Sequence, residues 1–187
     1  MYKRQVEVSG QAIFPVIEAL PAFLKEKTLE VTKNKVGGLK PEEWYPQQAW
    51  LDVLKYIEDE MGAFIMYHIG LAIPERVPLP SGINTLDLML QMWSQAYQMN
   101  HRNSKIEGEY RILEHNKESC MYRIETYTPY PCDMDRGVLT TFVKNFTQWA
   151  EIKVDLTKPC KKFGEDTSEF ILKYHCLLYT SPSPRDA

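Results

Sequence analysis

The sequence lacks any long apolar run and any dense cluster of lysine and arginine. No stretch is long and apolar enough to cross a bilayer as a helix, and the first residues lack the charged-then-apolar pattern of a signal peptide. The net charge is −3, and the most basic short run (Lys158, Lys161 and Lys162) is too small for a nucleic-acid surface. We therefore expect a cytoplasmic protein that binds no nucleic acid and has no membrane span.

Several motifs with well-defined chemistry are also missing. The chain has no glycine-rich loop that could cradle a phosphate and no Gly-x-Ser-x-Gly elbow. Its acidic residues follow helix surfaces, so they suggest no acid–base pair. These absences favour a function other than catalysis, although they leave an enzyme as an alternative.

The apolar residues that are present predict one α+β domain. With 187 residues, 44% of them hydrophobic, the chain can bury a sizeable core. Helical spacing or composition favours helices at 12–25, 46–62, 63–73 and 84–102, with a loop at 33–40. From Glu109 the apolar period changes to two, which predicts strands at 109–113, 119–126, 151–156 and 169–174, with one helix between the second and third strands. The order, helices followed by β-β-α-β-β, predicts N-terminal helices packed mainly on one face of a four-stranded antiparallel sheet.

The stretch 128–137, TPYPCDMDRG, predicts a sharp corner between a strand and a helix. Pro131 lacks the amide proton that a sheet needs, and Cys132 then lies at the helix start. Asp133 or Asp135 could cap the helix, and Gly137 would let another element approach closely. We interpret this stretch as a structural corner first and as a functional loop second.

The helix at 84–102 has apolar residues on two sides, which indicates burial on both sides. It is either a central core helix or one wall of a ligand cavity. In the second interpretation its polar end closes the cavity, although cations and asparagine are also common at any helix C-terminus. A histidine in the preceding helix is a core residue or a further ligand contact. The candidate ligand-binding residues are Met92, Trp93, Tyr97, Asn100, His101, Arg102 and His68.

The final residues read CLLYTSPSPRD, which matches a translated transposase sequencing adapter. We therefore expect residues 1–175 to be a single, C-terminally truncated ligand-binding domain and residues 176–187 to be adapter read-through. Cys120, Cys132 and Cys160 then remain as candidate metal ligands. They lack the paired spacing of zinc fingers, so free or structural thiols are the favoured interpretation.

Three motifs resemble a known superfamily. They are YQMNHR at 97–102, TPYPCDMDRG at 128–137 and CKKFGEDTSEF at 160–170. They look like the bacterial branch of the four-vinyl-reductase domain, which is grouped with the haem-NO-binding sensors and the small TRAPP trafficking subunits. The resemblance covers most of residues 9–175. It implies a sensory domain that holds a hydrophobic or aromatic small molecule under its helices and is often joined to a signalling output.

The resemblance also bears on cofactors. Some relatives bind zinc through a Cys-x7-Cys pair, and here Cys160 matches the first cysteine while Ser168 replaces the second. This replacement argues against a tight zinc site. The haem-binding branch carries a Tyr-x-Ser-x-Arg signature that holds the propionates, and no such string occurs before the adapter-like tail, which argues against haem.

The sequence thus predicts a ligand-binding sensor domain. Its apolar cavity would be lined from Met92, Trp93, Tyr97 and the helix at 63–73, with 100–102 as a polar rim. The alternatives are an accessory protein or enzyme of tetrapyrrole metabolism and a TRAPP-like interaction module, for which a homodimer would be expected.

Overall fold

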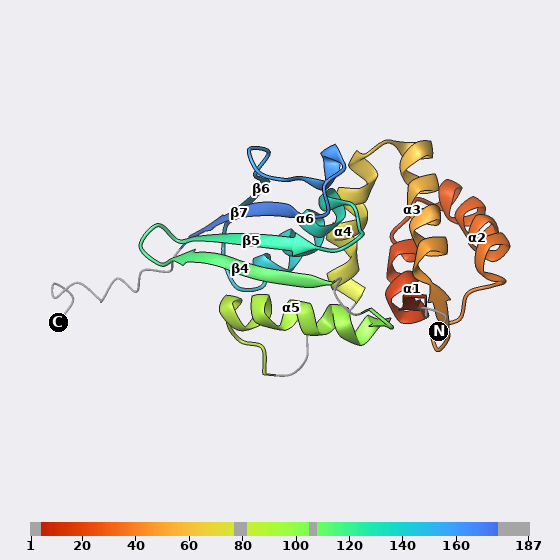
Figure 1. Cartoon of the computed structure of the whole chain (residues 1–187), viewed down its shortest axis with the longest axis horizontal. Helices are drawn as coiled ribbons and strands as arrows, with labels where there is room; N and C mark the ends of the chain where they lie inside the picture. The colour runs from red at the N-terminus through yellow and green to blue at the C-terminus, as the bar shows by residue number, and fades with distance from the viewer. Residues whose placement is uncertain (1–4, 77–81, 105–107, 176–187) are drawn as a thin grey trace, which may run out of the picture.

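A four-stranded antiparallel sheet forms the C-terminal half of the computed structural model, which describes residues 5–76, 82–104 and 108–175 (Figure 1). The spatial order is β4 (Glu109–Asn116), β5 (Met121–Tyr127), β7 (Ser168–Tyr174) and β6 (Ala150–Val154). Alternate residues of β5 and β7, among them Ile124, Phe170 and Leu172, are buried. The predicted α+β class and the antiparallel sheet are confirmed.

Helices dominate the N-terminal half, and in Figure 1 all of them except α4 lie at the end of the molecule away from the sheet. They are α1 (Gly10–Glu18), α2 (Ala22–Val36), α3 (Gln47–Met61) and α4 (Phe64–Arg76). A small sheet ties the ends of this half together, with β1 (Glu7–Ser9) between β2 (Trp44–Pro46) and β3 (His101–Arg102). Most of this small sheet was not predicted, because strands this short show no period.

Helix α5 (Leu86–Asn100) belongs to the cores of both halves. Leu90 and Trp93 pack in the core formed with the large sheet, whereas Tyr97 packs in the core formed with α1, α3 and α4. Strand β3 follows the helix at once and pairs with β1. The two apolar sides of α5 therefore reflect burial against two different partners.

Two predicted details are wrong. The loop expected at 33–40 begins only at Gly37, whose φ of +81° ends α2 in the left-handed region. Helix α6 (Cys132–Lys144) follows Pro131 without any side-chain cap. Asp133 and Asp135 lie in its first turn instead, where Lys162 and Lys161 hold their carboxylates.

Helices α4 and α6 cross almost backbone to backbone. A Cβ atom on Gly137 would lie 2.3 Å from the carbonyl oxygen of Tyr67, and one on Gly70 would lie 2.2 Å from that of Met134. Only glycine on both helices permits this approach. The crossing fixes the sheet half against the helical half.

No helix within the described ranges has the length and apolar character needed to cross a membrane. The adapter-like residues 176–187 lie outside the described residues, so the prediction about them stays a prediction.

Replacing Gly137 by alanine should lower the free energy of unfolding by about 1–3 kcal/mol, because the new methyl group has no space at the helix crossing. Intrinsic helix propensity alone would favour alanine by about 1 kcal/mol, so the two expectations have opposite signs. Urea unfolding gives the value. Lys144→Ala, at an exposed position of the same helix, is the control and should change stability by less than about 0.5 kcal/mol. A Gly137→Ala variant as stable as the parent would refute the close crossing.

Candidate functional site

A cavity of about 510 Å³ lies between the two halves. Residues from β1, α1, α3, α4, α5, β3, β4 and α6 line it, together with Tyr130 of the corner, and most of them are apolar or aromatic. Its volume falls in the range of ordinary small-molecule sites. We regard it as the candidate ligand site.

Stacked rings form one wall of the cavity. The rings of Trp93 and Tyr110 lie parallel with their centroids 3.9 Å apart, and those of Tyr97 and His101 lie parallel at 3.8 Å. Tyr130 meets Tyr97 edge to face at 6.2 Å. Such a wall offers flat apolar surfaces to a flat ligand.

His101 is the polar centre of this wall, and it is buried. Its Nδ1 lies 2.8 Å from the carbonyl oxygen of Tyr97, which can only accept, so Nδ1 carries the proton. Its Nε2, 2.6 Å from the Tyr130 hydroxyl, is then the acceptor. Burial lowers the pKa of His101 to about 4, which keeps the imidazole neutral at physiological pH.

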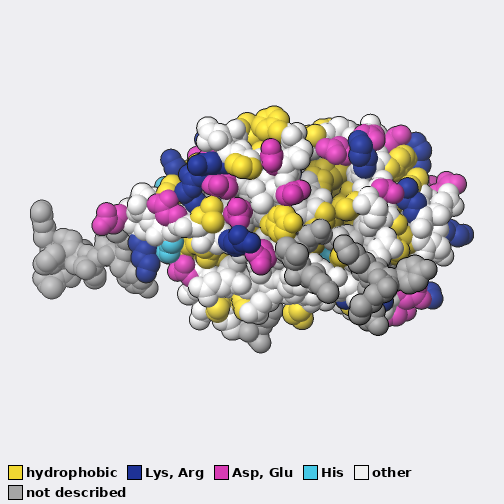
Figure 2. All heavy atoms as spheres, viewed as in Figure 1, with side chains coloured by type: hydrophobic (Ala, Val, Ile, Leu, Met, Phe, Trp, Pro, Cys, Tyr) yellow, Lys and Arg dark blue, Asp and Glu magenta, His cyan; other side chains and the backbone are white. Residues whose placement is uncertain are grey.

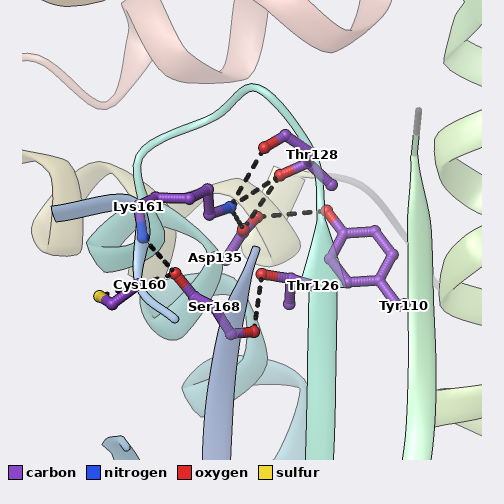
Figure 3. Close-up of polar contacts among 7 residues, drawn as sticks. All are labelled: Tyr110, Thr126, Thr128, Asp135, Cys160, Lys161 and Ser168. Atoms are coloured by element: carbon purple, nitrogen blue, oxygen red, sulfur yellow. Dashed lines mark hydrogen bonds and ion pairs between the residues drawn. The ribbon is translucent and has the colours of Figure 1, made fainter. Parts of the chain in front are cut away.

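A buried ion pair lies beside the cavity (Figure 3). Asp135, a lining residue, accepts hydrogen bonds from Lys161 Nζ at 2.7 Å, Thr128 Oγ1 at 3.1 Å and the Tyr110 hydroxyl at 3.2 Å. The side chains of Asp135 and Lys161 are only 4% and 10% exposed. Burial and the nearby carboxylate raise the pKa of Tyr110 well above its usual value, so its hydroxyl stays protonated and donates.

Four of the predicted ligand-binding residues line the cavity: Trp93, Tyr97, Asn100 and His101. The other three do not belong to its lining. Met92 lies one position from Trp93 and faces elsewhere on α5, since each residue turns a helix by about 100°. Arg102 is exposed on β3 and binds Glu7 at 2.7 Å.

His68 was expected in the core or at the ligand; the first expectation is wrong, and the residue is absent from the lining of this cavity. It is exposed on α4, where its ring contacts the rings of Phe64 and Tyr67. Of the whole helix at 63–73, only Ile73 reaches the cavity. The crossing with α6 turns much of α4 towards that helix instead.

The lining also includes residues that were not predicted from the sequence to face a cavity, among them Trp50, Tyr110, Tyr130 and Asp135. Tyr110 and Tyr130 come from a strand and a corner that contact α5 only in the folded chain. An aspartate shortly after two prolines, Asp135, could have indicated a functional residue. Its distance from the prolines, however, equally suited a residue in the first turn of a helix.

The three candidate cysteines do not come together. Cys160 accepts a hydrogen bond from the Ser168 hydroxyl at 3.8 Å, at the start of β7. Cys120 precedes β5 and its carbonyl binds the amide of Tyr174, at the far end of β7, roughly 20 Å away by strand length. Cys132 is buried with Cys160 in the sheet core. Within the described ranges no group of three or more His, Cys, Asp or Glu side chains could hold a metal ion.

Comparisons with known proteins identify the fold. No family model matches the chain, and no curated protein shows significant sequence similarity to it. Among solved structures, an H-NOX protein from S. oneidensis in the Fe(II)NO ligation state aligns with a TM-score of 0.66 and 9% identity, over 90% of this chain and 99% of the other. An oxygen-binding H-NOX domain related to soluble guanylate cyclases aligns with a TM-score of 0.60 and 14% identity, over 90% and 95%.

An Fe(II) unliganded H-NOX protein mutant from K. algicida aligns with a TM-score of 0.66 and 10% identity, over 91% of this chain and 98% of the other. The chain therefore has the fold of the H-NOX (haem-NO-binding) domains. The four-vinyl-reductase branch is not distinguished by these neighbours.

These neighbours correct the argument against haem. The sequence indicated that haem was unlikely, because the Tyr-x-Ser-x-Arg signature is missing. The structures that share this fold are haem proteins, one of them described through its haem redox potential and porphyrin distortion. The prediction that haem is unlikely is therefore contradicted by these neighbours.

The buried neutral state of His101 should make stability depend on pH. Its pKa is about 4 in the folded chain and about 6.5 when unfolded, so the unfolded chain binds the proton first as the pH falls. Stability should drop between pH 6.5 and pH 4, by up to about 3 kcal/mol. The measurement is the free energy of unfolding against pH for the parent and for His101→Gln. The difference between the two curves should change across this window; parallel curves would contradict a buried neutral imidazole.

Proposed function

We propose that this domain is a sensor that binds a flat aromatic cofactor, haem first of all, in the cavity between its halves. The proposal rests mainly on one observation: the wall of the apolar cavity contains a buried, neutral imidazole, that of His101. The shared fold with haem-containing H-NOX structures supports it.

The hydrogen bonds of His101 leave it suited to hold a metal ion. A metal-binding histidine typically donates its second N–H to a carbonyl, which fixes the ring and its tautomer. Here Nδ1 donates to the Tyr97 carbonyl, so Nε2 holds the lone pair that iron would need. The hydroxyl of Tyr130, which now donates to Nε2, would have to give up that bond.

The aromatic wall fits the faces of a porphyrin. The cavity offers fewer binding partners for the propionate carboxylates of haem. Trp93 and Tyr110 already stack at 3.9 Å, so a flat ligand must part them or slide along them. No arginine or lysine is among the described residues that line the cavity; Gln11 and Asn100 are polar groups there. We propose that these amides, with solvent, take the place of the missing propionate clamp. Haem, once bound, supplies an iron that can coordinate a diatomic gas.

An iron-free aromatic ligand is the second candidate. The observation that favours it is that both ring nitrogens of His101 already have partners, so the imidazole can serve as a hydrogen-bonding residue. This alternative corresponds to the four-vinyl-reductase branch. A cytoplasmic location, a homodimer and a signalling output remain predictions from the sequence.

Titration with haem tests the first candidate. The parent protein should bind one equivalent and shift the Soret band. His101→Gly should lose the shift and bind at least about tenfold more weakly, because loss of a metal ligand costs at least as much as loss of its supporting group. Added imidazole should restore the spectrum in His101→Gly by filling the space of the lost ring.

His68→Gly is the matched control, since His68 is a histidine outside the cavity. It should bind haem as the parent does. A parallel titration with iron-free protoporphyrin separates the candidates. Equal binding of both tetrapyrroles, unaffected by His101→Gly, would favour the iron-free ligand. Binding of neither would contradict the proposed function.

A further inference from the structure

A second and larger hollow, of about 870 Å³, opens on the surface. It lies between the turn that joins α3 to α4, the β5–α6 corner, and the 3-10 helix η1 (Lys161–Phe163) with the residues after it. Ala63, Pro129, Pro131 and Glu165 are among its lining residues. We call this hollow the corner groove. It shares Tyr130 with the ligand cavity but is otherwise lined by different residues.

Large apolar side chains stand open to solvent beside the corner groove. Phe163 is 69% exposed and lies between the lining residues Lys162 and Gly164, and Phe64 is 59% exposed and follows the lining residue Ala63. Figure 2 shows apolar side chains on the visible surface where the helical half meets the sheet half. Exposed apolar side chains grouped around a hollow are typical of sites that bind other proteins.

The charges around the corner groove leave an excess of carboxylates. Its three lysines are already paired: Lys55 with Asp59, Lys161 with Asp135 and Lys162 with Asp133. Three lining carboxylates form no ion pair with any described residue, namely those of Glu58, Glu165 and Asp166. The groove therefore complements a ligand that combines positive charge with apolar surface.

The buried ion pair connects the corner groove to the ligand cavity. Lys161 lines the groove and Asp135 lines the cavity, and their charged atoms are 2.7 Å apart (Figure 3). Lys161 Nζ also donates to the Thr128 hydroxyl at 3.1 Å, which holds η1 against the corner. On the cavity side, the Tyr110 hydroxyl donates to Asp135 while its ring stacks on Trp93.

We propose that the corner groove is the output surface of the domain and takes a partner protein segment that carries basic side chains next to apolar ones. A change in the ligand cavity reaches this surface through two contacts, that of Tyr110 with Asp135 and that of Asp135 with Lys161. Movement of Tyr110 removes one hydrogen bond from Asp135 and loosens the hold of Asp135 and Thr128 on η1. The docking itself needs no ligand in the cavity, so it does not depend on the proposed cofactor; only the communicated signal rests on the proposed function.

The test uses three short synthetic peptides on the full chain: one of arginine and leucine, one of glutamate and leucine, and one of arginine and serine. The arginine–leucine peptide should bind, and the other two should bind at least about tenfold more weakly, since each lacks one half of the complementarity. Two substitutions at exposed positions, Glu165→Lys in the groove lining and Phe163→Ser beside it, should each weaken binding of the arginine–leucine peptide by about tenfold. No binding, or binding that these variants leave unchanged, would overturn the docking surface.

Tyr110→Phe tests the connection without any cofactor. Tyr110 lies outside the groove lining, yet removal of its hydroxyl should change the affinity for the arginine–leucine peptide by at least about fivefold. Tyr122→Phe is the matched control, because its hydroxyl also donates to a carboxylate, that of Asp87 at 2.6 Å, away from both hollows. Equal affinity in the Tyr110→Phe and parent proteins would overturn the connection while the docking result stands. Failure of haem to bind would contradict the proposed function and leave both of these measurements valid.

Discussion

The close crossing of α4 and α6 at Gly70 and Gly137 joins the two halves of the molecule. With no side chain on either glycine, the backbones approach until a Cβ atom would overlap a carbonyl oxygen of the other helix. This contact joins a helical half and a sheet half that have separate apolar cores. The ligand cavity lies where these two cores meet, so its shape depends on how tightly the two helices cross.

Burial determines the electrostatics of the cavity. It holds the His101 imidazole neutral, with a defined tautomer and a lone pair on Nε2. The neighbouring carboxylate of Asp135 is buried, and Lys161, Thr128 and Tyr110 all donate hydrogen bonds to it. One wall of the cavity therefore carries an uncharged potential ligand, and the adjacent wall carries a compensated charge.

Much of the fold could be predicted from the sequence, because its signals are local. The period of two in residues 109–126 and 151–174 gave the strands, and the double apolar pattern of α5 gave a helix buried on two sides. The same helix supplied Trp93, Tyr97 and Asn100 to the predicted site, and His101 follows it directly as the first residue of β3. These four residues lie within nine consecutive positions of the chain, so their spacing is enough to place them together.

The rest of the site could not be predicted because it is assembled across elements. Tyr110 and Tyr130 reach the cavity from a strand and a corner, and the Asp135–Lys161 pair joins residues 26 positions apart. His68 misled because an apolar helix suggested burial, whereas the packing of α4 leaves this residue exposed. The prediction that haem is unlikely was wrong for a related reason. It rested on one missing local signature, whereas the likeness to haem-binding structures extends over the whole fold.

We propose that the cavity between the two halves holds a flat aromatic cofactor. The most direct measurement is a crystal structure of the protein after reconstitution with haem. We expect density for haem in this cavity, within reach of His101 Nε2, and a Tyr130 side chain moved away from that nitrogen. Density for haem only on the outer surface, or a cavity still closed by the stacked rings of Trp93 and Tyr110, would contradict this proposal.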